Sequence, residues 1–218
     1  MSVKTKRLVL LAVFVALAYA CSLYIRIPAM PVPPFLKYEP KDAILTLAGF
    51  IMGPLAALSA AVAAALLELS ISEHGIFGLL MNIVSSGAFC CTAAVVYRYK
   101  RTIWGAVLGL SAGWLFTVVV MMLWNFLIVP LYMPHVSHSQ AAAMLIPVFL
   151  PFNALKYGLS AGLAALLYKP VKRMLVRTNF LPASATVAQG KISMALLLAA
   201  SFLIAACALF ILLWNGIL

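Results

Sequence analysis

Charged residues are scarce in this chain. Only 9% of its 218 residues are Asp, Glu, Lys or Arg, whereas 66% are hydrophobic. A soluble globular domain has about 25% charged and roughly 45–50% apolar residues. Because such an apolar chain cannot cover itself with a water-facing surface, its composition excludes a soluble enzyme, a disulfide-rich secreted domain and a disordered protein. The mean hydropathy of +1.14 instead predicts a protein of the lipid bilayer.

Motifs for redox, metal or nucleotide chemistry are also missing. The four cysteines lack CxxC spacing and stand in or beside apolar segments, so we expect them to be packing residues. The stretch QGKI at 189–192 lacks the leading glycine and the Ser/Thr of a phosphate-binding loop, so any ATP hydrolysis would belong to another subunit. The histidines stand in loops without further ligands, and we expect no metal site.

Acidic residues are the scarcest charged type, with 4 Asp and Glu against 15 Lys and Arg. The basic residues gather at the ends of apolar runs, in the segments KTKR, RYKR and KPVKRMLVR. The positive-inside rule therefore predicts a cytoplasmic N-terminus and places these three segments inside. The loops SEHG and LYMPHVSHSQ contain no Lys or Arg and are predicted outside; the proline-rich loop 26–42 is an exception, because it is also outside but carries basic residues.

Long, continuous apolar runs predict an all-α integral membrane protein and exclude a β-barrel, whose strands alternate. We expect a six-helix membrane domain in residues 1–177, a linker in 178–191 and an additional C-terminal transmembrane helix in 192–218. A signal peptide cleaved before Cys21 is the alternative for the first run, but no secreted domain follows it. The expected helices cover residues 8–25, 43–52, 54–71, 77–97 and 103–129, then a sixth ending near 168 and a last run over 192–214.

Prolines mark the expected interruptions. Five of them make 26–42 an extended loop, and Gly53-Pro54 separates two helices. We expect Pro130 to follow the end of the fifth helix, and Pro147 and Pro151 to delay the start of the sixth.

Polar residues within the apolar runs predict a binding pocket. Lys156 and Asn153 are three residues apart and share a helix face. A charged side chain inside a membrane costs roughly 2.5–3.5 kcal/mol, so Lys156 should face a cavity or a partner unless it reaches the membrane surface. Asn82 and Asn125 fall in the same outer half of the predicted bundle, which favours one outward-facing pocket. Among the acids, a helix cap suits Asp42 at least as well as a ligand contact, and we expect Glu68 to point to water.

The order and spacing of several segments resemble the substrate-binding S components of energy-coupling factor (ECF) vitamin transporters, most of all the riboflavin-specific members. They cover roughly residues 5–175. Lys41 departs from the family pattern, which has serine at this position, and the run 192–214 has no counterpart there. The segments are FLKYEPKD at 35–42, GFIMGP at 49–54, WNF at 124–126 through Tyr132, Pro151 through Lys156, and the spacing of Ala12 and Ala16.

The resemblance implies a membrane subunit, not an enzyme, that captures riboflavin from outside and has no other cofactor. It implies docking through Ala12 and Ala16 onto a transmembrane coupling subunit, with two cytoplasmic ATPases driving release, in a prokaryotic plasma membrane. Aromatic residues such as Phe35, Tyr38 and Phe152 could pack against the flavin ring. By position, it assigns ligand binding to Glu39, Asn82, Asn125, Tyr132, Asn153 and Lys156.

Three alternatives stay open at this point. The chain could be an S component for another vitamin or precursor, such as pantothenate. It could be a small integral-membrane enzyme that uses Lys156, His135 or His138, although only four acidic residues are available for acid–base chemistry. It could also be a structural subunit, which would not need converging Asn and Lys side chains.

Overall fold

The structure is a computed structural model that describes residues 2–28, 36–72, 75–133 and 136–181. The expected C-terminal helix at 192–214 and most of the linker lie outside these residues. Five helical segments are long and apolar enough to cross a membrane, which confirms a helical membrane protein. The elements are α1 (Val3–Tyr24), β1 (Ile27–Pro28), β2 (Lys37–Tyr38), α2 (Lys41–Met52), α3 (Pro54–Glu68), η1 (Leu69–Ile71), α4 (Gly75–Tyr99), α5 (Ile103–Tyr132), α6 (His138–Met144), η2 (Leu145–Phe149) and α7 (Leu150–Arg177).

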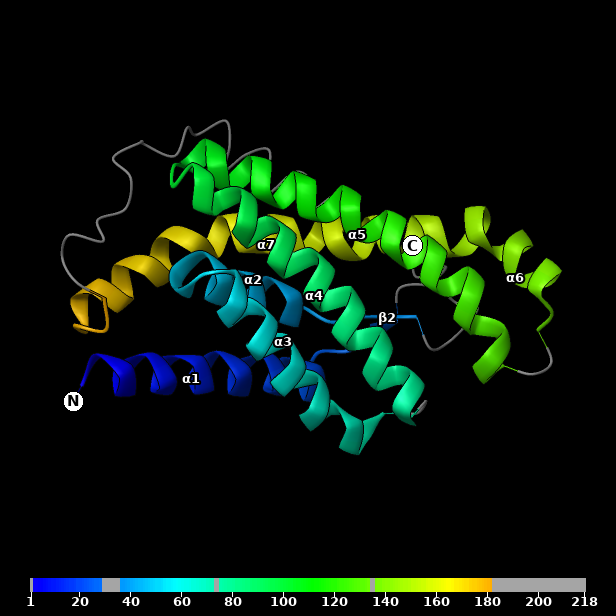
Figure 1. The fold of residues 1–218 in the computed structure, drawn as a ribbon, viewed down its shortest axis with the longest axis horizontal. Coiled ribbons are helices and arrows are strands. Elements are labelled where there is room, and N and C mark those ends of the chain that lie inside the picture. Colours follow the sequence, from blue (N-terminus) through cyan, green and yellow to red (C-terminus); the bar gives the residue numbers. More distant parts are fainter. Residues whose placement is uncertain (1, 29–35, 73–74, 134–135, 182–218) are drawn as a thin grey trace.

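The helices form an elongated bundle with two distinct ends (Figure 1). One end holds the start of α1, the break between α2 and α3, the turn between α4 and α5, and the end of α7. The other end holds the ribbon of β1 and β2, the η1 turn and α6. The basic segments at residues 4–7, 98–101 and 169–177 therefore gather at the first end, as their sequence positions predict.

Small residues allow the helices to approach closely. Gly109 and Gly113 of α5 face α4: a Cβ added at Gly109 would lie 2.6 Å from the Ala93 carbonyl oxygen, and one at Gly113 would lie 2.8 Å from that of Phe89. In membranes, where helices gain no hydrophobic advantage from associating, such close backbone packing supplies much of the attraction. The alanines of α3 act similarly, because Ala57, Ala60, Ala61 and Ala64 are all buried.

Gly53 makes the sharp turn between α2 and α3. Its φ of 105° lies in a region that favours glycine, and its N–H donates to the Gly49 carbonyl oxygen at 2.8 Å. The next residue, Pro54, begins α3 at a position where no intrahelical N–H is needed. The predicted break is confirmed, and it leaves α2 with 12 residues, too short to span a bilayer.

One proline-based expectation is wrong, and another holds in part. Pro130 lies inside α5, which continues to Tyr132. Helix α7 begins at Leu150 with Pro151 in its first turn, as expected, but it passes Pro170 and continues to Arg177 rather than ending near 168. Helical structure resumes at His138, before Pro147, because the chain passes that proline in a π-helical stretch, η2. Within a bundle, neighbouring helices and such local adjustments satisfy the backbone groups that a proline leaves free.

The proline-rich loop contains a short antiparallel ribbon. Ile27 pairs with Tyr38, and Pro28 pairs with Lys37. The four paired residues are extended, as predicted, whereas 29–35 lie outside the described residues. The pairing holds the residues just before α2 over the end of the bundle (Figure 1). This placement carries Glu39 toward the neighbouring helices.

Candidate functional site

A pocket opens at the end of the bundle that carries the ribbon. Side chains from the ribbon, η1, α3, α4, α5 and α7 line it, and its empty space is about 820 Å³, including the part open to solvent. Tyr132 lies at the end of α5, but its side chain is outside the described part of the structure. The other residues assigned to ligand binding all line this pocket: Glu39, Asn82, Asn125, Asn153 and Lys156.

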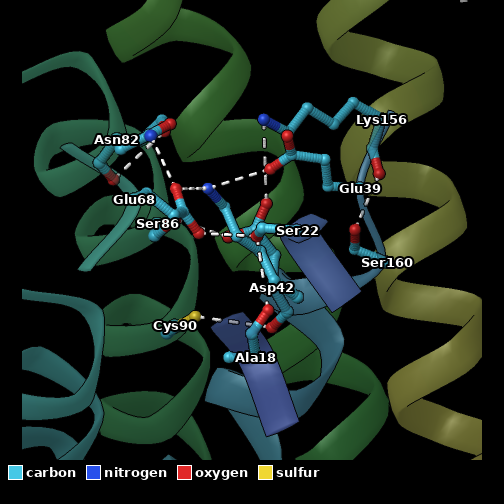
Figure 2. A network of polar contacts seen from close by, with 12 residues as sticks. Ala18, Ser22, Glu39, Asp42, Glu68, Asn82, Ser86, Cys90, Lys156 and Ser160 are labelled. Atoms are coloured by element: carbon cyan, nitrogen blue, oxygen red, sulfur yellow. Dashed lines mark hydrogen bonds and ion pairs between the residues drawn. The ribbon is translucent and has the colours of Figure 1, made fainter. Parts of the chain in front are cut away.

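Ion pairs connect several of the residues that line the pocket, and Figure 2 shows the polar contacts around them. Glu39 accepts from Arg26, with Nε 3.1 Å from Oε1, and lies 3.1 Å from the Lys41 ammonium group through Oε2. Lys41 is buried and also pairs with Glu68. Burial alone would raise the pKa of Glu39, but the surrounding cations, led by Lys41, hold this pKa below its ordinary value. Glu39 therefore remains an ionised acceptor at the pocket wall.

Glu68 is the centre of this network and not a water-facing residue, so that expectation is wrong. Only 2% of it is exposed. Its Oε1 accepts from the Ser22 hydroxyl at 2.6 Å, and its Oε2 accepts from the Asn82 amide at 2.7 Å and from Lys41. The signal in the sequence is the long apolar stretch that precedes Glu68, because a carboxylate at the end of a membrane helix needs partners wherever water does not reach it.

Asp42 is likewise part of the network, and the prediction that it caps a helix is wrong. The N-cap of α2 is Pro40, with no side-chain capping bond. Asp42 is fully buried and accepts from the Ser86 hydroxyl at 2.6 Å. Its other oxygen, Oδ2, lies 3.9 Å from the ammonium nitrogen of Lys156 and accepts no hydrogen bond among the described residues.

The charges in this network balance. The recorded ion pairs hold three cations and three carboxylates in two sets, one of four residues around Glu39 and Lys41 and one formed by Lys156 and Asp42. The whole chain, in contrast, has a formal net charge of +11. Buried charges are tolerated when they are paired and hydrogen-bonded. The members are Arg26, Lys41, Lys156, Glu39, Asp42 and Glu68.

Helix α7 supplies the opposite wall of the pocket. The Asn153 amide nitrogen donates to the carbonyl oxygen of Phe149, the last residue of the π-helical stretch, at 2.7 Å. This hydrogen bond fixes the orientation of the Asn153 amide, whose oxygen is an acceptor. Phe152 and Tyr157 add aromatic surface, and the Lys156 ammonium group lies 5.6 Å from the centre of the Tyr157 ring. The Tyr157 ring in turn packs against Phe89, with centroids 5.3 Å apart.

Of the two other aromatic residues expected to contact the ligand, only Tyr38 lies within the described residues. Tyr38 is buried against Val129 and Phe152 in the cluster beside the pocket but does not line it. Phe35 lies outside the described residues. The pocket thus combines ammonium, amide and carboxylate groups with apolar and aromatic walls, which is the pattern of a site that binds a small molecule and fixes its orientation.

Ala12 and Ala16 lie on α1 and do not line the pocket. Both are exposed, whereas Leu10, Phe14 and Ala18 of the same helix are buried in the bundle. The two alanines therefore belong to a face of α1 that the described chain leaves uncovered. Their role in docking stays a prediction.

Comparison with known proteins gives consistent matches over the described bundle. A family model for the substrate-specific component of ECF transporters matches residues 6–168. The chain is 26% identical over 179 residues to the riboflavin transporter RibU of Staphylococcus aureus (strain TCH60), covering 80% of this chain and 94% of that one. It is 27% identical over 182 residues to RibU of Streptococcus thermophilus (strain ATCC BAA-250 / LMG 18311), covering 79% and 86%.

A solved structure has the same fold. It is described as the S component of a bacterial ECF transporter, and it superimposes with a TM-score of 0.68 at 26% identity. The match covers 79% of this chain and 98% of the solved one.

Proposed function

This chain belongs to the family of substrate-specific components of ECF transporters, and we propose that it binds riboflavin in the pocket between the ribbon and α7. It is a transport component rather than an enzyme. The observation that carries the proposal is the convergence on one pocket of five polar residues from the ribbon loop, α4, α5 and α7. Both RibU relatives, named as riboflavin transporters, support this ligand over another vitamin.

The chemistry of riboflavin matches the pocket. Its ring system is flat and largely apolar, with an edge of hydrogen-bond donors and acceptors, and its ribityl chain carries several hydroxyl groups. Phe152, Met81 and Met121 offer apolar contacts. The amides of Asn125 and Asn153 offer both donors and acceptors. The Lys156 ammonium group can donate hydrogen bonds to the ribityl hydroxyls, and the Glu39 carboxylate can accept from them.

The wider transport cycle is also a proposal. We place the N-terminus and the basic end of the bundle in the cytoplasm by the positive-inside rule, so the pocket opens outward. The exposed face with Ala12 and Ala16 then meets a transmembrane coupling subunit, since small residues permit close helix contact. Two cytoplasmic ATPases drive inward release, and the chain resides in a prokaryotic plasma membrane.

Quenching of riboflavin fluorescence by the detergent-purified full chain tests the proposal. Wild-type protein should quench saturably. Lys156→Met should weaken binding about 10- to 100-fold, the usual effect of losing one hydrogen bond from a charged group. Lys172→Met is the matched control: this lysine is on the same helix, near the other end, where it donates to the Tyr168 hydroxyl at 3.2 Å.

The outcomes separate the ligand from the site. Equal affinities for the two lysine variants and wild type would remove Lys156 from the binding site. Absence of quenching by folded wild-type protein would overturn riboflavin as the ligand and leave family membership intact.

A further inference from the structure

A second cavity lies at the basic end of the bundle, opposite the riboflavin pocket. Its empty space is about 880 Å³, including the part open to solvent. Three arginines line it from separate elements: Arg7 from α1, Arg98 from α4 and Arg101 from the turn before α5. The break between α2 and α3 supplies the floor. We refer to this cavity as the arginine pocket.

Within the described residues, no carboxylate is recorded beside the arginine pocket. Of the four acidic residues, Glu39, Asp42 and Glu68 are committed to the network at the other end, and Glu73 follows η1 in sequence. The ion pairs recorded for the described residues include none of the three arginines. Arg7 makes one contact, from its guanidinium to the Met52 carbonyl oxygen at 3.4 Å, which ties α1 to the helix break.

The floor of the arginine pocket is also suited to an anion. Gly53 and Leu55 line it, so the first turn of the 15-residue helix α3 borders the cavity. A helix N-terminus carries partial positive charge from its unpaired N–H groups, which adds to the arginine field. At Gly53 a Cβ would meet nothing within 4 Å, so the space above the turn is open.

The surroundings select a membrane lipid over a soluble anion. Leu55 is 79% exposed and Trp104, in the first turn of α5, is 74% exposed. Tryptophan at a helix end is typical of the headgroup level of a bilayer, and an exposed leucine there offers contact to acyl chains. Basic pockets between transmembrane helices at the cytoplasmic side are sites for phosphate-bearing lipid headgroups.

We propose that the arginine pocket binds the phosphate headgroup of an anionic membrane lipid. The arginine side chains neutralise the phosphate, and the acyl chains lie along the apolar surface near Leu55 and Trp104. One bound lipid would thereby contact α1, the α2–α3 break and the α4–α5 turn at the same time. The proposal goes beyond riboflavin binding and does not depend on it.

Native mass spectrometry of the full chain in detergent tests this. Phosphatidylglycerol is titrated against phosphatidylcholine with the same acyl chains, and inorganic phosphate is added as a competitor. The pocket variant is R98Q/R101Q. The control is R173Q/R177Q, which removes the same charge from exposed positions of α7 that do not line the cavity. Circular dichroism and monodisperse elution establish that each variant is folded.

The expected result is preferential binding of one phosphatidylglycerol, weakened about 30-fold in R98Q/R101Q, since each basic side chain contributes about fivefold near an anionic surface. The control should retain this site, and millimolar phosphate should not displace the lipid. Equal losses in both variants would overturn the proposal, as would displacement by inorganic phosphate. It would also fail if R98Q/R101Q kept the lipid and lost only the coupling subunit, because the arginines would then serve a protein interface.

Discussion

The ion pair between Lys41 and Glu68 offers a quantitative test of the buried network. Glu68→Met would leave the Lys41 ammonium group with Glu39 alone, 3.1 Å away, and would remove the acceptor for Ser22 and Asn82. Lys41→Met would leave Glu68 as a buried carboxylate with only neutral donors. Each single change therefore leaves a buried charge less well compensated.

The magnitude follows from the burial of both partners. Removing one member of a buried ion pair costs about 3–5 kcal/mol, whereas replacing both by apolar residues avoids the unpaired charge. For a chain of this size, 1 kcal/mol shifts the unfolding midpoint by about 2–4 °C, so each single variant should lose about 6–20 °C. The double variant K41M/E68M should lose no more than the worse single one.

Thermal unfolding of detergent-purified protein, followed by circular dichroism, is the assay. Lys100→Met is the control, because this lysine is exposed at the opposite end and should change stability by less than about 0.5 kcal/mol. If the two single losses simply add in K41M/E68M, within about 0.5 kcal/mol, the two side chains are not coupled and the reasoning is refuted.

Two further predictions concern helix contacts. Gly109→Ala should cost about 1–3 kcal/mol of stability, because the new Cβ would lie 2.6 Å from the Ala93 carbonyl oxygen. Gly87→Ala, whose Cβ would meet Leu58 at 3.6 Å, should be neutral or stabilising; equal unfolding midpoints would contradict the role of close α4–α5 packing. A12F/A16F should abolish co-purification with the coupling subunit while leaving riboflavin affinity unchanged, because both alanines are exposed. Unimpaired co-purification would exclude this face from docking.

The helices and the pocket residues were largely predictable from the sequence. Apolar length, basic clusters and the glycine–proline break depend on local sequence, and the resulting prediction of a helical bundle is confirmed. Asn153 and Lys156 were predictable as pocket residues because polar groups in a membrane helix are costly and must face a cavity or partner. The prolines misled because a bundle satisfies freed backbone groups that an isolated helix could not.

The charged network was not predictable in the same way. Asp42 and Glu68 each stand near a helix end, where capping or hydration is the ordinary role of an acid. Their partners come from other helices: Ser86 from α4 for Asp42, and Ser22 from α1 for Glu68. Lys41 is the cation that joins Glu39 to Glu68. Such pairings depend on tertiary packing and leave little trace in local sequence.

The visible absorption spectrum of the full chain, purified in detergent after expression in riboflavin-containing medium, tests the central claim most directly. The account predicts a yellow protein with flavin absorption bands that are released on denaturation. A folded, colourless protein that also fails to quench the fluorescence of added riboflavin would contradict it.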